Sequence, residues 1–469
     1  MDTRQISNLD FEKTADSEES SIVETKPKVF EVPQKNGNKA IRFLQYTAFS
    51  TYRKIFTVIF LANLAAFIAI IVRKHGNPKA TDIATAVAAN AMVSVLFRQE
   101  NFVNIIYEIF TRAPRSLPLW IRKDFAKVYH YGGAHSGTGV ASVVWVTLYV
   151  AIITKDFIMN PDESSRALIA TSYILLSAFL FIVIAAHPTF RHTFHDYYEA
   201  THRFAGWTVV VVFWTSFMVA ANEERKIQHI PLGLYIAKTP TFWFLCVITF
   251  CIILTWLRLR SREVFPEVLS EHAIRLHFKY RPLEAFYGVR VSTKPLTEWH
   301  AFATIPDSDE NGKITGYSFV VSNAGDWTNN IIRNPPTRLW IRSDPLFGLL
   351  VTARLFKRFV IVATGSGIGP FLSLLHADLA PCRILWSTQK PEVTFGQTII
   401  DTVLKADSKA VIWNTRERGR PDMIQLTHQL VRESDAEAVF IISNPKVTRL
   451  VVYGMETRGV ACYGAIFDS

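Results

Sequence analysis

Long apolar stretches dominate the first half of this 469-residue chain. Six of them reach the roughly 17–25 residues that a helix needs to cross the hydrocarbon core of a bilayer. They lie at about residues 54–72, 80–97, 137–154, 167–186, 201–221 and 241–257. The second is rich in alanine and contains Asp82 and Asn90, so a buried amphipathic helix is the alternative there. The pattern predicts a six-helix transmembrane domain, an all-α bundle, over residues 46–260.

The distribution of charge predicts how these helices are oriented. Basic residues concentrate between the second and third stretches, after the fourth and after the sixth, whereas the first short loop, with Arg73 and Lys74, is an exception. By the positive-inside rule the basic connections face the cytosol. We therefore expect a multi-pass membrane protein whose termini and second half are cytosolic. Residues 1–45 are mostly polar, which predicts a disordered cytosolic tail.

The formal net charge of +11 bears on the partners of the chain. In a membrane protein of this pattern it reflects topology and contact with anionic membrane lipid. The sequence shows no stripe of basic and aromatic residues of the kind that binds nucleic acid, so we expect no nucleic-acid partner. The four cysteines fall in a cytosolic or membrane setting, where disulfides are not expected.

The hydropathy pattern changes after residue 263. Apolar and polar residues alternate at 272–280, 317–321 and 339–342, between prolines, which predicts a small antiparallel β-barrel over residues 265–355. Continuous apolar runs then alternate with helical segments, at 359–363, 384–386, 410–413, 438–442 and 460–466. These runs predict an α/β domain over residues 356–469, with a parallel sheet covered by helices on both faces.

A glycine-rich turn follows the first strand of the predicted parallel sheet. Its residues are Gly365, Ser366, Gly367, Ile368, Gly369 and Pro370. Glycines allow the backbone to approach a pyrophosphate, and the next helix offers free N–H groups to it. Pro370 stands where the dinucleotide-binding fingerprint of dehydrogenases has a glycine. The second strand also ends without the acidic residue that binds a ribose hydroxyl in that fingerprint.

Basic residues near the second and third strands bear on which nicotinamide cofactor binds. Lys390 and Arg416, together with Ser387 and Arg418, are candidates for binding a 2′-phosphate, which favours NADPH over NADH. The alternative for each of them is an ordinary solvated surface charge.

Two further motifs precede the glycine turn, at residues 299–305 and 324–328. With them, the chain from about residue 265 to its end resembles the FAD and nicotinamide modules of the ferredoxin reductase superfamily. The membrane half in front makes the whole resemble the ferric reductase and NADPH oxidase group. Within it the chain is most similar to fungal TmpA-like integral membrane proteins, whose ends resemble residues 463–469.

The resemblance implies a membrane-bound, NAD(P)H-dependent flavoprotein oxidoreductase that passes electrons through FAD to a small-molecule acceptor. It assigns flavin contacts to His300, Phe302, Thr304 and Ile305, and pyrophosphate contacts to Gly325 and Thr328. A strand and a capped turn without any ligand are the alternative. The first motif departs from the family by an inserted Ala303 and by Ala301 in place of proline.

One residue stands where the family places a catalytic cysteine beside the nicotinamide. Here Ser443 occupies that position, and we expect it to be the catalytic residue. A flavin- or nucleotide-binding membrane sensor with reduced turnover, acting in fungal development, is the alternative function. The missing cysteine is one reason for retaining this alternative.

Two histidines near the predicted inner face are candidates for haem ligation. His135 lies among small residues against which a porphyrin would fit, and His202 begins the fifth apolar stretch. Imidazoles on two facing helices are a common axial pair for haem iron. The family has a second histidine about four turns further along each helix, and this chain has none there. One haem b is therefore expected, and histidines bonded to backbone or lipid headgroups are the alternative.

Overall fold

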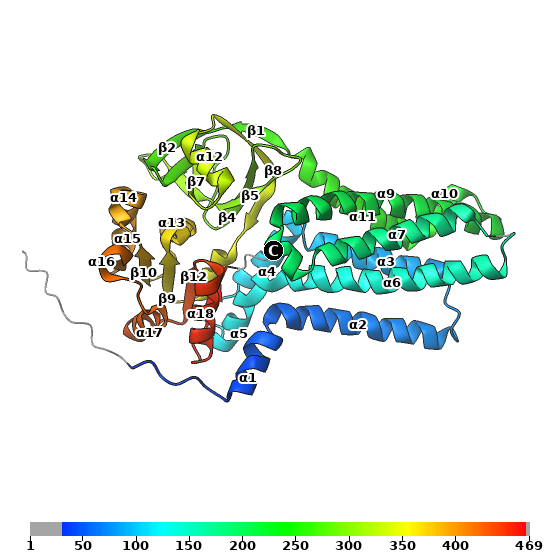
Figure 1. Ribbon diagram of the computed structural model, residues 1–469, viewed down its shortest axis with the longest axis horizontal. Helices are drawn as coiled ribbons and strands as arrows, with labels where there is room; N and C mark the ends of the chain where they lie inside the picture. Colours follow the sequence, from blue (N-terminus) through cyan, green and yellow to red (C-terminus); the bar gives the residue numbers. More distant parts are fainter. Residues whose placement is uncertain (1–30, 163, 466–469) are drawn as a thin grey trace, which may run out of the picture. The chain divides into compact units, whose positions relative to one another are not determined.

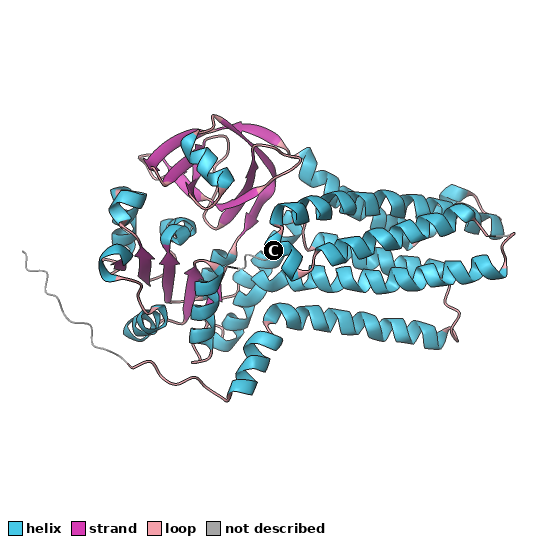
Figure 2. Cartoon of the chain, viewed as in Figure 1, coloured by secondary structure: helices cyan, strands magenta, loops and turns pink. Residues whose placement is uncertain are grey.

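The computed structural model describes residues 31–162 and 164–465 of the chain. Helices make up the first half of this part, and strands begin at Arg260, as Figures 1 and 2 show. Residues 1–30 of the predicted tail and residues 466–469 of the end motif lie outside the described residues.

The first described residues differ from the predicted tail. The chain forms α1 (Lys39–Phe43) and a π-helical turn, η1 (Leu44–Ala48), before the first long helix. Tyr46 Oη donates a hydrogen bond of 3.0 Å to the carbonyl oxygen of Glu456, near the end of the chain. The expected boundary at residue 45 therefore falls inside structure that packs against the α/β domain.

Six long helices correspond to the six apolar stretches. They are α2 (Thr51–Arg73), α3 (Ala80–Leu96), α6 (Gly132–Met159), α7 (Arg166–Ala185), α9 (His195–Ile227) and α11 (Pro240–Leu257). Shorter elements connect them: α4 (Glu100–Thr111), α5 (Leu119–Phe125), η2 (Ala126–Tyr131), α8 (Pro188–Thr193) and α10 (Leu232–Lys238). Among the described residues, five helical segments are long and apolar enough to cross a membrane. The helix α3 makes a sixth only if it is counted together with α4, from which it is bent by 71°.

The bend after α3 directs α4 toward the second half of the chain. Buried residues recur every three or four positions along α4, so one face of this helix is built to pack. Asn104 on that face donates to the carbonyl oxygen of Pro345 at 2.9 Å and accepts from the N–H of Phe347 at 2.8 Å. The second apolar stretch thus forms α3, and α4, which follows it directly, packs on β8.

Two four-stranded antiparallel sheets form the predicted barrel domain. Their strand orders are β1-β8-β4-β5 and β2-β3-β7-β6. The strands are β1 (Arg260–Glu263), β2 (Phe265–Ser270), β3 (Ala273–Phe278), β4 (Tyr287–Ser292), β5 (His300–Ala303), β6 (Ile305–Ser308), β7 (Ile314–Ser322) and β8 (Arg338–Phe347). The three predicted segments correspond to β3, β7 and β8, whose alternate apolar side chains fill one core between the sheets. A single helix, α12 (Asp326–Arg333), lies between β7 and β8.

A five-stranded parallel sheet follows, as the apolar runs predict. Its strands are β9 (Phe359–Thr364), β10 (Cys382–Thr388), β11 (Val411–Asn414), β12 (Ala438–Ile442) and β13 (Cys462–Gly464). The turns and helices of this domain are η3 (Leu349–Leu355), η4 (Gly365–Gly367), α13 (Ile368–His376), α14 (Pro391–Phe395), α15 (Gln397–Ala406), α16 (Thr415–Arg418), α17 (Met423–Ser434) and α18 (Pro445–Glu456). All side chains of Phe359, Val360, Ile361, Val362 and Ala363 are at most 2% exposed, because helices cover both faces of β9.

The strand order of the parallel sheet determines where a ligand would meet it. The order is β11-β10-β9-β12-β13, so the first strand lies in the middle and the chain reverses its direction of winding between β9 and β12. In open α/β sheets, ligands bind beyond the carboxyl ends of the strands at such a switch point. The glycine turn follows β9 at this place (Figure 1).

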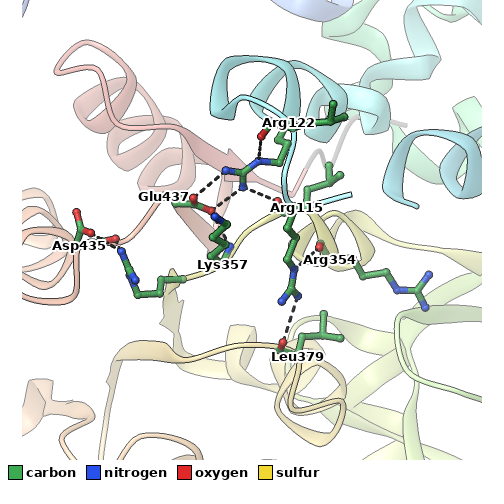
Figure 3. A network of polar contacts seen from close by, with 10 residues as sticks. Arg115, Arg122, Arg354, Lys357, Leu379, Asp435 and Glu437 are labelled. Carbon is green, nitrogen blue, oxygen red and sulfur yellow. Dashed lines mark hydrogen bonds and ion pairs between the residues drawn. The ribbon is translucent and has the colours of Figure 1, made fainter. Parts of the chain in front are cut away.

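A buried ion pair joins α5 to the α/β domain, as Figure 3 shows. The guanidinium of Arg122 forms two hydrogen bonds with the Glu437 carboxylate, at 2.8 and 2.9 Å, and a third of 2.8 Å to the carbonyl oxygen of Leu355. Glu437 also accepts a hydrogen bond of 2.7 Å from the N–H of Lys357. Nearby, Arg115 Nε donates to the carbonyl oxygen of Arg354 at 2.8 Å. The connection between the helices α4 and α6 is therefore anchored on the α/β domain.

Candidate functional site

The glycine turn has two positions at which the backbone itself requires glycine. Gly365 has a φ of +51°, in the left-handed region, and its carbonyl oxygen accepts a hydrogen bond of 2.9 Å from Trp386 Nε1. Gly367 lies against the end of β12, where a Cβ atom would be only 2.1 Å from the carbonyl oxygen of Ile442. Close packing of the turn on the end of β12 therefore requires glycine here, in addition to any need of a ligand.

The remaining residues of the turn differ in exposure. Ser366 is exposed and Pro370 is half-buried. Ile368 is 1% exposed and belongs to the hydrophobic core, while Gly369 is buried against Val320 of β7. The Ile368 side chain is therefore occupied by core packing. Because Gly367 is also buried, the surface that the turn offers to a nucleotide is made by Gly365 and Ser366.

Ser443 lies beside this turn. It follows β12, and its hydroxyl forms a hydrogen bond with the hydroxyl of Thr364 at the end of β9. The carbonyl oxygen of Ser443 accepts a second hydrogen bond, of 3.0 Å, from Thr448 Oγ1 in α18. Because the residue is only 5% exposed and held by both neighbours, its hydroxyl has a defined direction next to the glycine turn.

The two basic candidates for phosphate binding lie on neighbouring loops. Lys390 and Arg416 are exposed and follow the ends of β10 and β11. Their backbone N–H groups both donate to Asn414 Oδ1, each at 3.1 Å. Sequence reasoning missed this role of Asn414, although an asparagine directly before a helix is a frequent cap. The shared acceptor holds the backbones of both residues at the same edge of the sheet.

An indole ring covers the predicted flavin strand. The imidazole of His300 in β5 stacks on Trp327 of α12, with ring centres 4.0 Å apart and planes inclined by 23°. Phe302 stacks on Phe319 at 4.7 Å and lies 5.9 Å from Trp327. Trp327 Nε1 is buried and has no hydrogen-bond partner among the described residues. This face thus accepts a flat aromatic ring, and here a side chain of the chain itself provides it.

Two of the predicted flavin contacts have side chains that face the protein interior. Thr304 is fully buried, and its hydroxyl donates a hydrogen bond of 2.9 Å to the carbonyl oxygen of Tyr287. Ile305 is 5% exposed and belongs to the core shared with the α/β domain. Both side chains serve to join β6 to its surroundings, so only His300 and Phe302 of this motif lie on the ring-binding face.

The start of α12 has the form expected for an anion site, with one difference. Gly325 precedes the helix, and a Cβ atom at this position would meet nothing within 4 Å. Thr328 Oγ1 accepts hydrogen bonds from the N–H groups of Ala324 and Gly325, at 2.9 and 3.0 Å. Thr328 therefore caps its own helix, and open space for a pyrophosphate lies at Gly325.

The two candidate haem ligands lie close together. The ring centres of His135 in α6 and His202 in α9 are 6.1 Å apart. His135 Nδ1 lies 2.9 Å from both the carbonyl oxygen and the hydroxyl of Ser94 in α3, whereas His202 Nδ1 is buried without a partner among the described residues. Metal–imidazole bonds are about 2 Å long, so two rings on opposite sides of one iron have centres roughly 6 Å apart. The spacing fits an axial pair.

The glycines near His135 have a different role from the one expected. A Cβ atom on Gly133 would lie 2.4 Å from the carbonyl oxygen of Tyr52 in α2, and one on Gly137 would lie 3.1 Å from that of Phe56. Small residues let two helices approach closely in a membrane. These glycines therefore pack α6 on α2 and are not free to receive a porphyrin.

A further cationic side chain near the site escaped the sequence reasoning. The Arg342 guanidinium in β8 lies over the Trp299 ring at 4.3 Å and over the Trp256 ring at 5.3 Å. Burial, followed by the positive charges of Arg290 and Arg203, lowers the pKa of Arg342 to about 9. The only signal in the sequence is the alternation along β8, which places Arg342 on the face opposite Ile341.

Comparisons with known proteins find sequence similarity to fungal proteins that are named as reductases. Residues 349–469 match the family described as the C-terminal domain of adenylate-forming reductase 03009. Adenylate-forming reductase 03009 of Coprinopsis cinerea is 44% identical over 469 residues, which cover 97% of this chain and 45% of that protein. Adenylate-forming reductase 06235 of the same fungus is 42% identical, covering 97% of this chain and 44% of that protein.

The solved structures that match this chain have low sequence identity to it. A ferredoxin NADP+ reductase from Neisseria gonorrhoeae with bound FAD and NADP is 15% identical, with a TM-score of 0.36, covering 45% of this chain and 99% of that one. A flavohemoglobin from Malassezia yamatoensis with bound FAD and heme is 13% identical, with a TM-score of 0.38, covering 82% of this chain and 98% of that one. The chain spans less than half the length of the two curated fungal relatives that it matches.

Proposed function

We propose that the chain is a membrane-embedded, NAD(P)H-dependent flavoprotein oxidoreductase that passes electrons through FAD to a small-molecule acceptor on the cytosolic side. One observation carries the proposal. The glycine-turn helix α13 lies directly against the barrel, where Ser373 Oγ accepts a hydrogen bond of 2.9 Å from the N–H of Phe286. This bond joins the helix after the candidate nucleotide turn to the residue before β4, the strand that pairs with the candidate flavin strand β5, and forms a junction between the two candidate sites. The relatives named as reductases agree with this assignment.

The residues at this junction have distinct proposed roles. Bound FAD supplies the chemistry, because it accepts a hydride and releases single electrons. The backbone at Gly365 and Ser366 would hold the dinucleotide phosphates. The Ser443 hydroxyl, oriented by Thr364, would donate a hydrogen bond to the nicotinamide. His300, Phe302 and the start of α12 at Gly325 would hold the flavin, after Trp327 moves from its place over His300.

We further propose that the nucleotide is NADPH. Lys390 and Arg416 are held together through Asn414, and an extra phosphate with two negative charges would meet both. Replacing Lys390 and Arg416 with glutamine should weaken NADPH binding by roughly tenfold or more, since a hydrogen bond to a charged group contributes about 1.5–3 kcal/mol. Binding of NADH should remain unchanged.

A haem between α6 and α9 forms a separate part of the proposal. The 6.1 Å separation of the His135 and His202 rings supports it, as does the contact of His135 Nδ1 with the Ser94 carbonyl. A carbonyl that holds one imidazole nitrogen leaves the other nitrogen oriented toward a metal. We expect a Soret band in haem-replete protein that disappears in His202→Ala. No Soret band in the wild type would rule out haem.

An absorption spectrum tests the proposed enzyme. The full chain is purified in detergent with added FAD, and NADPH is added without oxygen. We expect the absorbance of the oxidised flavin to disappear within seconds after NADPH is added. A bound flavin that stays oxidised in excess NADPH would refute turnover, and absence of any flavin would refute the cofactor assignment.

A specific contact favours a second function, a flavin- or nucleotide-binding sensor without turnover. Trp327 occupies the face of His300 in the described structure, as an inhibitory ring would. The variant Trp327→Ala separates the two functions. If the chain is a reductase, the variant keeps or gains NADPH-dependent bleaching, whereas in a sensor neither protein bleaches while both bind flavin.

A further inference from the structure

An arginine-rich pocket lies where the last long helix meets the barrel. We call it the basic pocket; its cavity is about 280 Å³. Leu257, the last residue of α11, forms one wall. Its charged lining consists of Arg258, Arg260, Arg262, Arg281 and Asp344. The pocket is separate from the glycine turn, the flavin strand and the histidine pair, so the proposed redox chemistry gives it no role.

Positive charge exceeds negative charge in this lining. Four guanidinium groups meet a single carboxylate, that of Asp344. Arg258 contacts this carboxylate directly, and Arg281 Nη1 lies 3.9 Å from its other oxygen. Within the described part of the chain, Arg260 and Arg262 have no carboxylate within 4.0 Å. Arg260 Nη1 instead donates hydrogen bonds of 3.0 and 2.8 Å to the carbonyl oxygens of Leu257 and Leu259 at the end of α11. The lining as a whole therefore keeps an excess of positive charge for a ligand, chiefly that of Arg262.

The backbone of β8 gives the pocket its shape. Ser343 has a φ of +59°, a left-handed conformation that is uncommon for serine. It lies where the pairing of β8 with β4 shifts register, between Arg342 and Leu346. Bulges of this kind turn side chains in new directions, and strained residues gather at functional sites. Here the irregular segment brings Ser343 and Asp344 into the pocket wall.

An aromatic ring fixes one of the unpaired arginines. The Arg262 guanidinium lies 4.2 Å from the centre of the Tyr280 ring. Tyr280 Oη in turn is 3.1 Å from Tyr317 Oη, in the core of the barrel. An arginine that is held over a ring keeps the edge of its guanidinium fork available for an anion. The Arg262 guanidinium is therefore partly held in position before a ligand binds.

We propose that the basic pocket binds the phosphate group of an anionic lipid headgroup. Arginine forks match the geometry of phosphate oxygens, and basic residues next to a membrane helix attract anionic lipid. The end of α11 at Leu257 places the pocket where a headgroup would leave the bilayer. The inference takes this membrane placement from the proposed function and is independent of the redox chemistry. A soluble phosphate has the same recognition chemistry, so the test must separate the two sources.

Binding is measured on the detergent-purified full chain with three probes: dioctanoyl phosphatidic acid, dioctanoyl phosphatidylcholine and inorganic phosphate. The test variant combines Arg262→Gln and Arg281→Gln. The control combines Lys313→Gln and Lys405→Gln, which remove the same charge from exposed positions outside the pocket. Each basic residue near an anionic membrane surface contributes roughly fivefold in affinity. We therefore expect the test variant to bind phosphatidic acid about 25-fold more weakly, and the control to bind it like wild type.

The outcomes are distinct. Phosphatidic acid that binds more tightly than both other probes, with the loss confined to the test variant, supports a lipid site. Inorganic phosphate that binds as tightly as phosphatidic acid would show a soluble ligand and overturn the lipid assignment. Equal losses of affinity in the test and control variants would show that general surface charge causes the effect, and would overturn the proposed lipid site.

Failure of this inference can be told apart from failure of the proposed function. Flavin content and NADPH-dependent bleaching are read on the same samples before lipid is added. If the chain binds no flavin, and the test variant still binds phosphatidic acid more weakly than wild type does, the proposed enzyme is refuted and the lipid site is supported. Normal bleaching with unchanged lipid binding in the test variant supports the enzyme and refutes the pocket. Equal flavin content also shows that the variants are folded.

Discussion

Single side chains at the flavin strand show how a motif and its geometry can differ. His300 and Phe302 lie beside the Trp327 ring, and their contact with flavin stays a prediction. Thr304 and Ile305 belong to the same motif and point into the protein. The sequence alone does not reveal this, because the strand breaks between β5 and β6 at Thr304 and changes the side that each residue faces. The position of Trp327 is likewise a product of tertiary packing.

Two glycines that the sequence treats alike should respond differently to substitution. In Gly367→Ala, the new methyl group would meet the backbone oxygen of Ile442, so β9 and β12 must separate. Overpacking of this kind costs about 1–3 kcal/mol, and we expect a lower midpoint in thermal unfolding together with weaker NADPH binding. Gly325→Ala is the control, because its extended φ of 172° and the open space around it tolerate a methyl group. Equal stability of both variants would contradict the packing role.

At the scale of elements, regular patterns were predictable and docking was not. The five strands of the parallel sheet lie where continuous apolar runs predict them, because burial on both faces leaves no polar alternative. The barrel strands β3, β7 and β8 follow from alternation. The role of α4 and α5 did not follow, since an amphipathic helix does not tell which surface will cover it. Arg122 belongs to the basic connection between the second and third apolar stretches, from which the orientation is predicted, and in the structure it is buried and paired with Glu437.

The Arg122–Glu437 pair should contribute far more to stability than an exposed pair of the same chemistry. Removing one partner of a buried pair leaves an uncompensated charge and typically costs 3–5 kcal/mol. Arg122→Ala should therefore lower the unfolding midpoint strongly and release α5 from the α/β domain. Arg112→Ala is a matched control, because the Arg112 side chain is 78% exposed and its pair with Glu108 should contribute less than about 1 kcal/mol. Similar midpoints for the two variants would disprove the anchoring role.

The helix α18 carries a carboxyl group whose titration should affect stability near neutral pH. Burial raises the pKa of Glu456 to about 7, although Lys127 and Lys54 act in the opposite direction. The folded state therefore holds the proton more tightly than the unfolded state. This stabilisation is complete below pH 4.5, the ordinary value, and is lost as the pH rises through about 7.

The variant Glu456→Gln should remove this pH dependence. The loss in wild-type stability between pH 5 and pH 8 amounts to roughly 3 kcal/mol at most, from the size of the pKa shift. Unfolding midpoints of both proteins in detergent, measured across this range, provide the test. We expect the midpoint of the variant to exceed that of wild type at pH 8 and to change less with pH. A parallel pH dependence in both proteins would contradict the assignment.

At the scale of the whole molecule, the orientation in the membrane is the proposal most open to a direct test. Arg73 and Lys74 lie on the outer side in the proposed orientation, against the general rule. In a background with the four native cysteines replaced by serine, Lys313→Cys and Asp162→Cys place thiols in the barrel and in the connection between α6 and α7. A membrane-impermeant thiol reagent on intact cells should label only the second. Labelling of the first would reverse the orientation.

The anchoring of α5 by Glu437 also determines how the chain can be divided for study. Residues 260–469 look like a complete flavin and nucleotide module when only their strands are considered. Yet Val103, Tyr107 and Ala126 of the helical half are buried in the same core as Phe359 and Phe440. A fragment that begins at β1 would expose this apolar surface to water and leave Glu437 without its guanidinium. Expression of the isolated second half should therefore yield aggregated protein, and solubility would have to be restored by supplying residues 100–131 in the same chain.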